Sequence, residues 1–383
     1  MGICGSVALG SRSFLAWFFT SGVGVDPRGQ DYTTLPLIRE DLSENITFGE
    51  SAIIPKDRAS KKLVDGYYTS QGSIQNDFDP FYFKELFGHL LQDASITTAL
   101  GVPFYSGPGA FAMGTYVREG VNMYVVQRGG TVTTVGIVLD HTAGTRDVDG
   151  VIFKFVSSTL ISKGFDQLTG PGPVPGFLSI LKVIDEGKDL LEVLFTDCRI
   201  DRATLQLDQG NIMTTTWHVV AIEAEDVTIE APPVAANYIQ PFRQDRVVSY
   251  DVVMKVDGLD QVCVKSLSLD INNNILKNVF TLGNRYRTSL PYMEFIVSGA
   301  MEIYLTDDKQ AYDLFHDELF FDVRLQMIAG DGFVDIHLPD CRFSQGTRTP
   351  TIQGNGVIIE SYQFRAIKRS QAYAIKLETT RPV

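Results

Sequence analysis

The sequence has few of the residues that catalytic, metal and nucleic-acid sites use most. Among its 383 residues are four cysteines and five histidines, and 46 acidic residues outnumber 33 basic ones, for a formal net charge of −13. Cysteines this few and scattered exclude a disulfide-stapled fold and predict synthesis in a reducing cytoplasm. Because a negative average surface repels phosphate, we do not expect tight nucleic-acid binding.

Long hydrophobic runs are also absent. The apolar run Phe14–Phe19 is far shorter than the roughly 20 residues of a membrane-spanning helix, and it lacks the basic and apolar regions of a secretory signal. We therefore expect no membrane association and interpret residues 1–30 as an N-terminal arm. Grouped exposed aromatic residues usually mark interfaces. The candidate assembly contacts in this arm are Phe14, Trp17, Phe18 and Phe19.

No catalytic motif stands out. The sequence contains neither a G-x-x-x-x-G-K-[ST] phosphate loop nor a G-x-S-x-G nucleophile elbow, and its histidines form no His-x-x-x-His pair. We therefore predict no catalytic residue, no metal site and no cofactor. Cys198 and Cys341 are interpreted as buried small apolar residues, not as nucleophiles. A hydrolase that uses an unrecognised pair of carboxylates stays open as an alternative.

Two parts of the sequence resemble each other. Asp41–Ile74 lies over Ser268–Met301 without gaps at an offset of 227, and Asp-Cys-Arg at 197–199 recurs at 340–342, an offset of 143. The identities of the first block include Leu42 with Leu269, Asn45 with Asn272, Arg58 with Arg285, Leu63 with Leu290 and Gly72 with Gly299. Because the offset falls from 227 to 143, the first copy carries about 84 residues that the second lacks. Since the order of the blocks is kept, we predict two copies of one domain.

Each copy is expected to be mainly β, with one short helix. Four segments are rich in β-branched and aromatic residues and in places alternate with period two, as strands do: 213–224, 247–256, 262–271 and 356–367. Asp79–Leu91 and Asp307–Phe320 each begin with an aspartate that can cap a helix. Leu207–Ile212 and Asp270–Ile275 supply Gly and Asn for hairpin turns.

The predicted fold class is therefore β-rich α+β: two tandem β-sandwich or half-barrel domains, each with one flanking helix. The arm at 1–30 is followed by a first domain at 31–230, a proline-containing linker at 231–241 and a second domain at 242–383. The first domain holds an insertion at about 100–167, expected to be a β-rich elaboration on the outer surface. Within it, Asn122–His141 is interpreted as a hairpin that turns at Gly129 and Gly130.

These segments, taken in order, resemble a phage tail tube (major tail) protein of the duplicated-domain kind. The resemblance rests on Val264–Ile275, then Leu282–Phe315, then Ile336–Ile367, and on Gly10–Phe19 followed by Leu35–Arg58 at the start of the first domain. Each pattern is loose in residue identity, but together they cover nearly the whole chain outside the insertion. The insertion departs from the family pattern.

The resemblance implies a structural virion protein, made in the host cytoplasm and carried in the phage tail. In such tubes each domain contributes a sheet to a barrel around a lumen, and rings stack into the conduit for genome ejection. Two domains per chain imply a homotrimeric, pseudo-hexameric ring. The implied partners are the chain itself, the tape measure and other tail proteins, and passing double-stranded DNA that is not tightly bound. An acidic lumen would repel the phosphates of that DNA.

Other functions remain open at this point. One is another tail component on the same fold, a hub or terminator ring that caps a tube. A second is a carbohydrate-binding or adhesion module, in which the aromatic residues of Gly101–Tyr116 form the ligand site. Polymerisation separates the first from a tube protein, and glycan binding would indicate the second.

Overall fold

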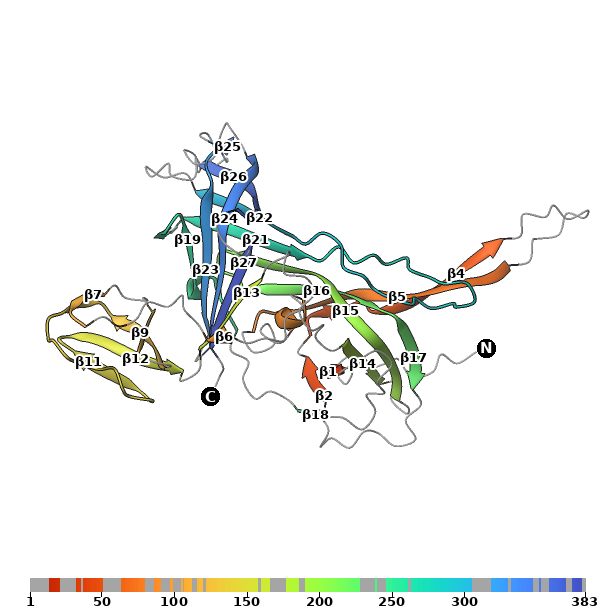
Figure 1. Ribbon diagram of the computed structural model, residues 1–383, viewed down its shortest axis with the longest axis horizontal. Coiled ribbons are helices and arrows are strands. Elements are labelled where there is room, and N and C mark those ends of the chain that lie inside the picture. Colours follow the sequence, from red (N-terminus) through yellow and green to blue (C-terminus); the bar gives the residue numbers. More distant parts are fainter. Residues whose placement is uncertain are drawn as a thin grey trace, which may run out of the picture.

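The computed structural model of the chain is mainly β, as predicted (Figure 1). It describes residues 14–20, 32–35, 37–50, 63–79, 86–90, 97–98, 105, 107–111, 116–119, 122–157, 160–165, 177–185, 190–227, 238–239, 246–260, 263–304, 318–329, 332–346, 351–352, 358–369 and 374–380. The predicted linker at 231–241 falls almost entirely outside these ranges. Of it, only β18 (Tyr238–Ile239) is described, and this strand pairs in parallel with β2 (Tyr32–Leu35).

One sheet contains the first strand of the chain. Moving across it from β2, the strands are β1 (Phe14–Thr20), β14 (Phe177–Asp185), the first half of β15 (Leu190–Asp208) and β17 (Glu223–Val227). A similar group further along the chain consists of β20 (Leu259–Asp260), β19 (Val252–Val256), β23 (Phe321–Ala329), the first part of β24 (Gly332–Gly346) and β27 (Ile375–Thr380). In both groups the neighbouring strands are antiparallel.

A second set of strands runs through both halves of the chain. The order is β4 (Ser43–Glu50), β5 (Leu63–Asp77), β16 (Thr214–Ala221), the second half of β15, β21 (Val264–Asn272), β22 (Ile296–Tyr304), β26 (Ile358–Ala366) and the end of β24. Two short strands extend it: β3 (Arg39–Glu40) pairs with β5, and β25 (Thr351–Ile352) pairs with β26. We call this set the continuous sheet.

The long strands β15 and β24 join the two kinds of sheet. The first half of β15 pairs with β14 and β17, and its second half, from Arg199 on, pairs with β16 and β21. The core lies between the sheets, because Trp17 and Ile180 of one pack in the same cluster as Ala203 and Trp217 of the other. Burying these apolar faces supplies the main stabilisation of the fold.

The segments predicted as strands are largely confirmed. Residues 247–256 differ, because a 3-10 turn at Ser249–Asp251 precedes β19, so only the second half of this segment is a strand. The turn predicted at Leu207–Ile212 is present, with Gly210 at φ 80°. Asn274 also has a positive φ of 46°, but β21 is followed by a long connection at 273–295 in place of the predicted tight hairpin.

Helix is scarce among the described residues. Residues 86–90 of the predicted helix at Asp79–Leu91 are helical, and Leu86, Phe87 and Leu90 pack into the core. Most of the predicted helix at Asp307–Phe320 lies outside the described residues, and its end at 318–320 is not helical.

The predicted insertion contains a lobe with a small core of its own, seen apart from the rest in Figure 1. The strands of the lobe are β7 (Gly109–Phe111), β8 (Tyr116–Glu119), β9 (Asn122–Arg128), β10 (Gly130–Val132), β11 (Thr145–Val148) and β12 (Val151–Ser157). The buried Tyr124 donates its hydroxyl to the carbonyl oxygens of Leu139 (2.6 Å) and His141 (3.0 Å). Further along, β13 (Leu160–Phe165) leaves the lobe and pairs with β27 and with β6 (Thr97–Thr98).

The hairpin predicted at Asn122–His141 is wrong. Strand β9 pairs with β8 and β12, whereas β10 pairs with β7 in a separate two-stranded sheet. The physical reason is that the lobe closes around its own apolar residues, and residues 129–130 carry the chain from one of its sheets to the other. Alternation identified the strands here but could not identify their partners.

Gly299 of β22 provides a test of core packing. A Cβ at this position would overlap the ring of Phe364, which lies opposite it on β26 and is 1% exposed. We expect Gly299→Ala to lower the free energy of unfolding by about 1–3 kcal/mol through overpacking, measured by chemical denaturation. Adding Phe364→Leu should recover part of this loss, whereas Gly88→Ala, where a Cβ meets nothing, should cost none. Equal effects of the two glycine substitutions would contradict this account.

Candidate assembly surface

The strand registers of the first half recur in the second half. The recurrence follows the offsets of the sequence comparison: 227 for β4 and β5, 143 for β14 and β15, and 145 for β16. Corresponding Cα partners are Ser43–Gln71 and Asp270–Ser298, Gly72–Val219 and Gly299–Phe364, Arg199–Val220 and Arg342–Arg365, and Leu178–Cys198 and Phe321–Cys341. Even the irregularities correspond, because the register shifts at Ile200/Arg202 and at Phe343/Gln345. Register is strongly specified wherever one face of a sheet is buried.

The two halves of the continuous sheet meet where β15 pairs with β21. This antiparallel junction extends from Arg202 opposite Asn272 to Asp208 opposite Ser266. Ala203 and Leu205 face the core, as do Leu269 and Ile271 on the partner strand, so the core passes through the junction without a break. On the opposite face, Arg202 and Asp270 form an ion pair across it.

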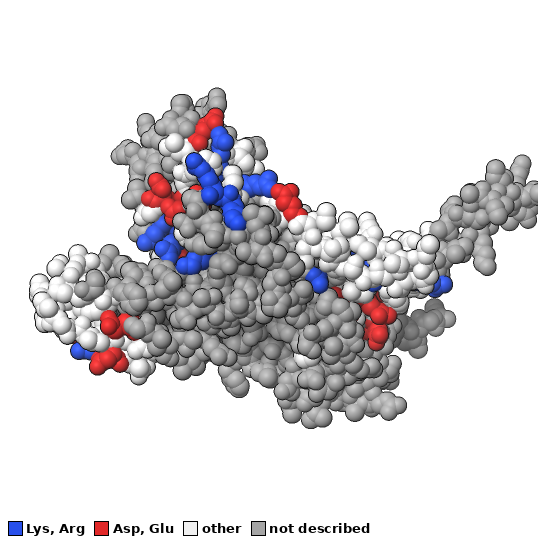
Figure 2. Space-filling view, in the orientation of Figure 1, with Lys and Arg blue, Asp and Glu red and all other residues white. Residues whose placement is uncertain are grey.

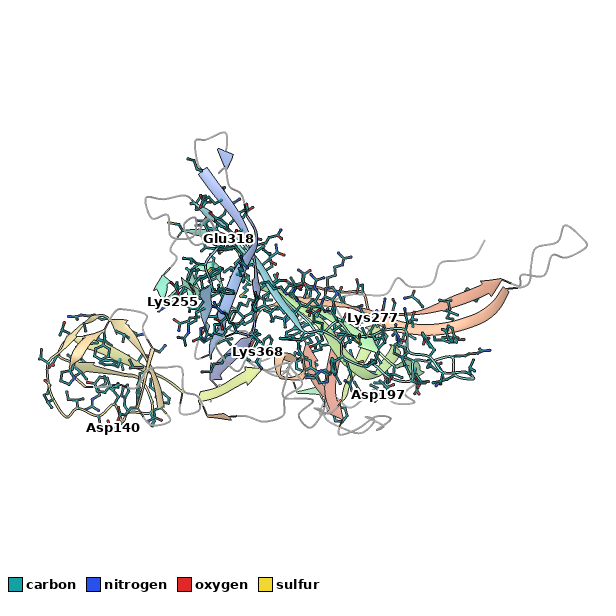
Figure 3. The ribbon with its side chains drawn as sticks, turned by 45° about the horizontal axis from the view of Figure 1, so that its top comes forward. Asp140, Asp197, Lys255, Lys277, Glu318 and Lys368 are labelled. Carbon is teal, nitrogen blue, oxygen red and sulfur yellow. The ribbon has the colours of Figure 1, made fainter. Side chains whose placement is uncertain are left out.

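The connection at 273–295 strengthens this junction. Figure 1 shows it running from β21 along β5, which belongs to the first half of the chain. Lys277, labelled in Figure 3, pairs with Asp201 of β15 at 2.7 Å. The same Asp201 accepts a hydrogen bond from the backbone N–H of Ile275 (2.7 Å), and its carbonyl oxygen accepts one from that of Asn273 (2.7 Å).

Arg287 is the central side chain of this connection. It is 2% exposed and donates hydrogen bonds to the carbonyl oxygens of Ser70 (2.8 Å), Ala221 (2.9 Å) and Lys277 (2.7 Å). Burial lowers the pKa of its guanidinium, but an arginine remains charged at any ordinary pH. Because Ser70 lies on β5 and Ala221 on β16, one buried cation joins the second half of the chain to two strands of the first.

The continuous sheet has two ends. At one end β4 and β3 pair only with β5, and at the other Arg342–Gly346 of β24 pairs only with β26, as far as the described residues show. An open strand edge presents unpaired backbone groups, which are a template for pairing with another chain. The two ends are therefore the parts of this sheet best suited to self-association.

Comparison with known proteins identifies the family. A family model described as phage tail tube protein matches residues 10–366, which is most of the chain. The chain belongs to the phage tail tube protein family. No curated protein matches it.

Membership in the family defines the role of the chain in general terms. As a tail tube protein it is a structural, non-enzymatic component of the virion tail and assembles with copies of itself into the tube. This confirms the family resemblance drawn from the sequence.

The tube protein presents a polar face on the side of the continuous sheet away from the core. Core-facing residues alternate along β21 and β22 with outward-facing ones, most of them small or polar. The outward-facing residues around the junction include Arg202, Thr204, Gln206, Asp208, Ser266, Ser268, Asp270, Asn272, Ser298, Ala300, Glu302, Ser361, Gln363 and Arg365. Two of the carboxylates are paired, Asp270 with Arg202 and Glu302 with Lys265 (2.8 Å). This face thus has little of the negative charge that the composition suggests.

Three of the four aromatic candidates, Phe14, Trp17 and Phe18, are buried or half-buried. Residues 14–20 are a full strand, β1, and Trp17 is 3% exposed in the core. Phe14 and Phe18 are half-buried against Ala16, Leu181, Val183 and Leu194, while Phe19 lies on the same strand, paired with Leu178. Whether these residues contact another subunit or ring stays a prediction.

Two of the aromatic residues considered for a carbohydrate site, Tyr105 and Phe111, are engaged inside the lobe. Tyr105 is 7% exposed and its ring stacks on Phe111 (5.6 Å between centroids). Both rings also meet Phe153 edge-on, at 5.5 and 5.4 Å. Glycan platforms need exposed aromatic faces, whereas these faces pack on one another.

The described residues contain no group of three or more metal-ligating side chains, and among their helices none is long and apolar enough to cross a membrane. Cys198 and Cys341 are both buried and free, as predicted. Burial is the main cause that raises the pKa of each thiol, so both stay protonated and unreactive. The buried Asp335 pairs with Arg324 at 2.6 Å.

Glu192 occupies the position that corresponds to Asp335 at the offset of 143, but without a cation. Both residues are buried, at 2% and 0% exposure. Arg324, the partner of Asp335, corresponds to Leu181 in the first half. Among the described residues, neither carboxylate oxygen of Glu192 has a hydrogen-bond partner, and burial raises the pKa of this carboxyl above its ordinary 4.5. Sequence reasoning missed this site because only the strand registers align the two positions.

Removing Arg287 tests the docking of the connection on the first half. Arg287→Met would leave the Ser70 and Ala221 carbonyl oxygens without this donor, at a cost of about 1–3 kcal/mol for each buried group. We expect faster amide exchange across 273–295 and a lower free energy of unfolding, measured by hydrogen exchange and denaturation. Arg285→Ala removes an equal charge from an exposed side chain but keeps the backbone oxygen that accepts from Tyr68 N–H (2.9 Å). Similar exchange rates in the two variants would contradict the assigned role.

Glu192 predicts a pH dependence of stability. Since its folded pKa is raised, the protonated carboxyl favours the folded state below the unfolded pKa of 4.5, and this contribution is lost as the pH rises through the folded pKa. Glu192→Gln should therefore raise the melting temperature at about pH 8 and change it little at about pH 4. Glu318→Gln, at a side chain 70% exposed, is the matched control. A gain of equal size at both pH values would show that the charge of Glu192 is not the cause.

Proposed function

We propose that three copies of this tail tube protein close into a ring with pseudo-sixfold symmetry, and that these rings stack head to tail into the conduit for the phage genome. The observation that supports this most directly is the recurrence of the strand registers at the sequence offsets. Each chain has two equivalent four-stranded units in the continuous sheet. One consists of β4, β5, β16 and the second half of β15, and the other of β21, β22, β26 and the end of β24. Three chains therefore supply six equivalent units. In this proposal the units belong to tandem domains at 31–230 and 242–383, connected through 231–241.

Ring closure follows from the unpaired ends of the continuous sheet. Contacts that join unlike surfaces generate a ring when the rotation closes. Closing the sheet on itself also removes its open edges, at β4 and at the end of β24. The core-facing side is already covered by strands such as β14 and β23, so the uncovered polar face becomes the inner wall.

The polar face suits a bore that double-stranded DNA passes without binding. Short hydroxyl and amide side chains dominate it, and its charges are mostly paired within the chain. Because the described cations Arg202 and Lys265 are paired with carboxylates, the wall makes few counterion-releasing contacts with phosphate, so passing DNA is not held. In this proposal the wall carries little net charge, because Asp270 and Glu302 are paired with Arg202 and Lys265. The lobe then lies on the outer side of the ring, and the tape measure and other tail proteins remain the proposed partners.

Assembly is tested by mass and by imaging of the same sample. Purified protein, concentrated stepwise, is followed by light scattering and by electron microscopy. We expect hollow rings or tubes in which each layer has the mass of three chains of 42.4 kDa. Layers of six chains would overturn the trimer, and isolated rings that never stack would favour a capping ring over a tube. A monomer at every concentration, also when tail initiator proteins are added, would overturn self-assembly.

A further inference from the structure

We propose that neighbouring chains in the ring join through a copy of the junction between β15 and β21. Strand β4 of one chain would pair, antiparallel, with the end of β24 of the next, with Asn45 opposite Gln345. The proposal rests on the ring assembly proposed above and adds the partner strands and their register. At both open edges of the continuous sheet, the partner strand comes from another copy of this chain.

The register follows from the strand pairings within the chain. At the junction Arg202 is opposite Asn272. The offset of 143 takes Arg202 to Gln345, and the offset of 227 takes Asn272 back to Asn45. These offsets are reliable here because they reproduce the neighbouring pairings and the register shift beside Gln345. A shift of this register by one residue would turn the core-facing side chains of one strand to the polar face, so such a shift is not tolerated.

The backbone groups needed for this pairing have suitable counterparts. Within the chain, Asp201 accepts from the N–H groups of Asn273 and Ile275, the first with its carbonyl oxygen and the second with its carboxylate. Asp201 corresponds to Ser344, and the two donors correspond to Ile46 and Phe48. Ser344 is exposed and has both a carbonyl oxygen and a hydroxyl, so it can accept both bonds from a neighbouring chain.

Exposed apolar side chains on β4 and β5 also support a contact between this hairpin and the next chain. Ile46 is 42% exposed and Phe48 57%, and Tyr67, 46% exposed, stacks its ring on Phe280 of the same chain (4.2 Å between centroids). Figure 2 shows the visible described surface of this hairpin with few charged residues, while Lys, Arg, Asp and Glu lie intermixed over β24 and β26. Exposed apolar groups of this kind mark protein interfaces.

The second half of the chain shows what Phe48 would meet. Its counterpart Ile275 is 5% exposed and packs against Val220 and Leu290. Val220 corresponds to Arg365, which is exposed on β26. The ring of Phe48 would therefore cover the stem and guanidinium of Arg365 of the next chain, a favourable cation–π and apolar contact.

Cysteine pairs test the register in the assembled protein. Asn45→Cys and Gln345→Cys are combined in one chain whose Cys4 and Cys263 are changed to serine, and assemblies are oxidised and analysed by denaturing electrophoresis. We expect covalent dimers and trimers, with the series ending at the trimer. Arg202→Cys with Asn272→Cys is the matched control, which should crosslink within one chain and leave its mass unchanged. Asn45→Cys with Gln363→Cys, one strand further into the sheet, should not crosslink.

The outcomes distinguish an error in the proposed strand register from a failure of the ring assembly. Rings that form with the expected mass but crosslink only at the Gln363 pair, or at neither pair although the control crosslinks, would overturn the register and leave the ring standing. Parent protein that never assembles would overturn the ring. As a second measurement, Phe48→Asp should raise the concentration needed for half assembly at least tenfold. Val135→Asp, at an 82% exposed position of the lobe, should leave that concentration unchanged, and equal effects would overturn the contact.

Discussion

The antiparallel pairing of β15 with β21 is the constraint on which the rest of the structure depends. It makes one sheet out of strands from both halves of the chain and carries the core across the join at Ala203 and Ile271. The ion pair of Arg202 with Asp270 spans it, and the buried Arg287 ties the connection that follows β21 to β5 and β16. Because β15 continues into the other sheet, the same strand also joins the continuous sheet to β14 and β17.

This arrangement explains why a tube protein needs so little chemistry. Its function is carried by strand edges, by the alternation of core and polar faces and by a few buried polar groups. Cys198 and Cys341, the most suggestive pair in the sequence, lie where β15 and β24 pass from one sheet to the next and are inert there. Their recurrence reflects a shared strand geometry and not a reactive site.

Sequence patterns located most of the strands, but the partners of those strands depended on contacts distant in the chain. The turn at Gly210 was predictable because a tight hairpin needs a residue with positive φ. The same kind of signal at Asn274 did not predict the long connection, since the connection is held by acceptors near residues 70, 201 and 221. Likewise, period-two alternation around Gly129 and Gly130 identified strands but not the two separate sheets they join. The aromatic run at β1 was interpreted as part of an N-terminal arm, but the sequence did not show that Trp17 packs in the core.

By itself, the sequence determined that the chain is β-rich, lacks a catalytic or metal motif, contains related segments at offsets of 227 and 143, and resembles tail tube proteins. These features are local or compositional, so they can be read without knowing which strands meet. Only the tertiary structure decided which edges remain open, that the polar face carries paired charges, and that Glu192 is buried without the cation that Asp335 has. Such features depend on strand pairings between residues far apart in sequence, which alternation along a single strand does not specify.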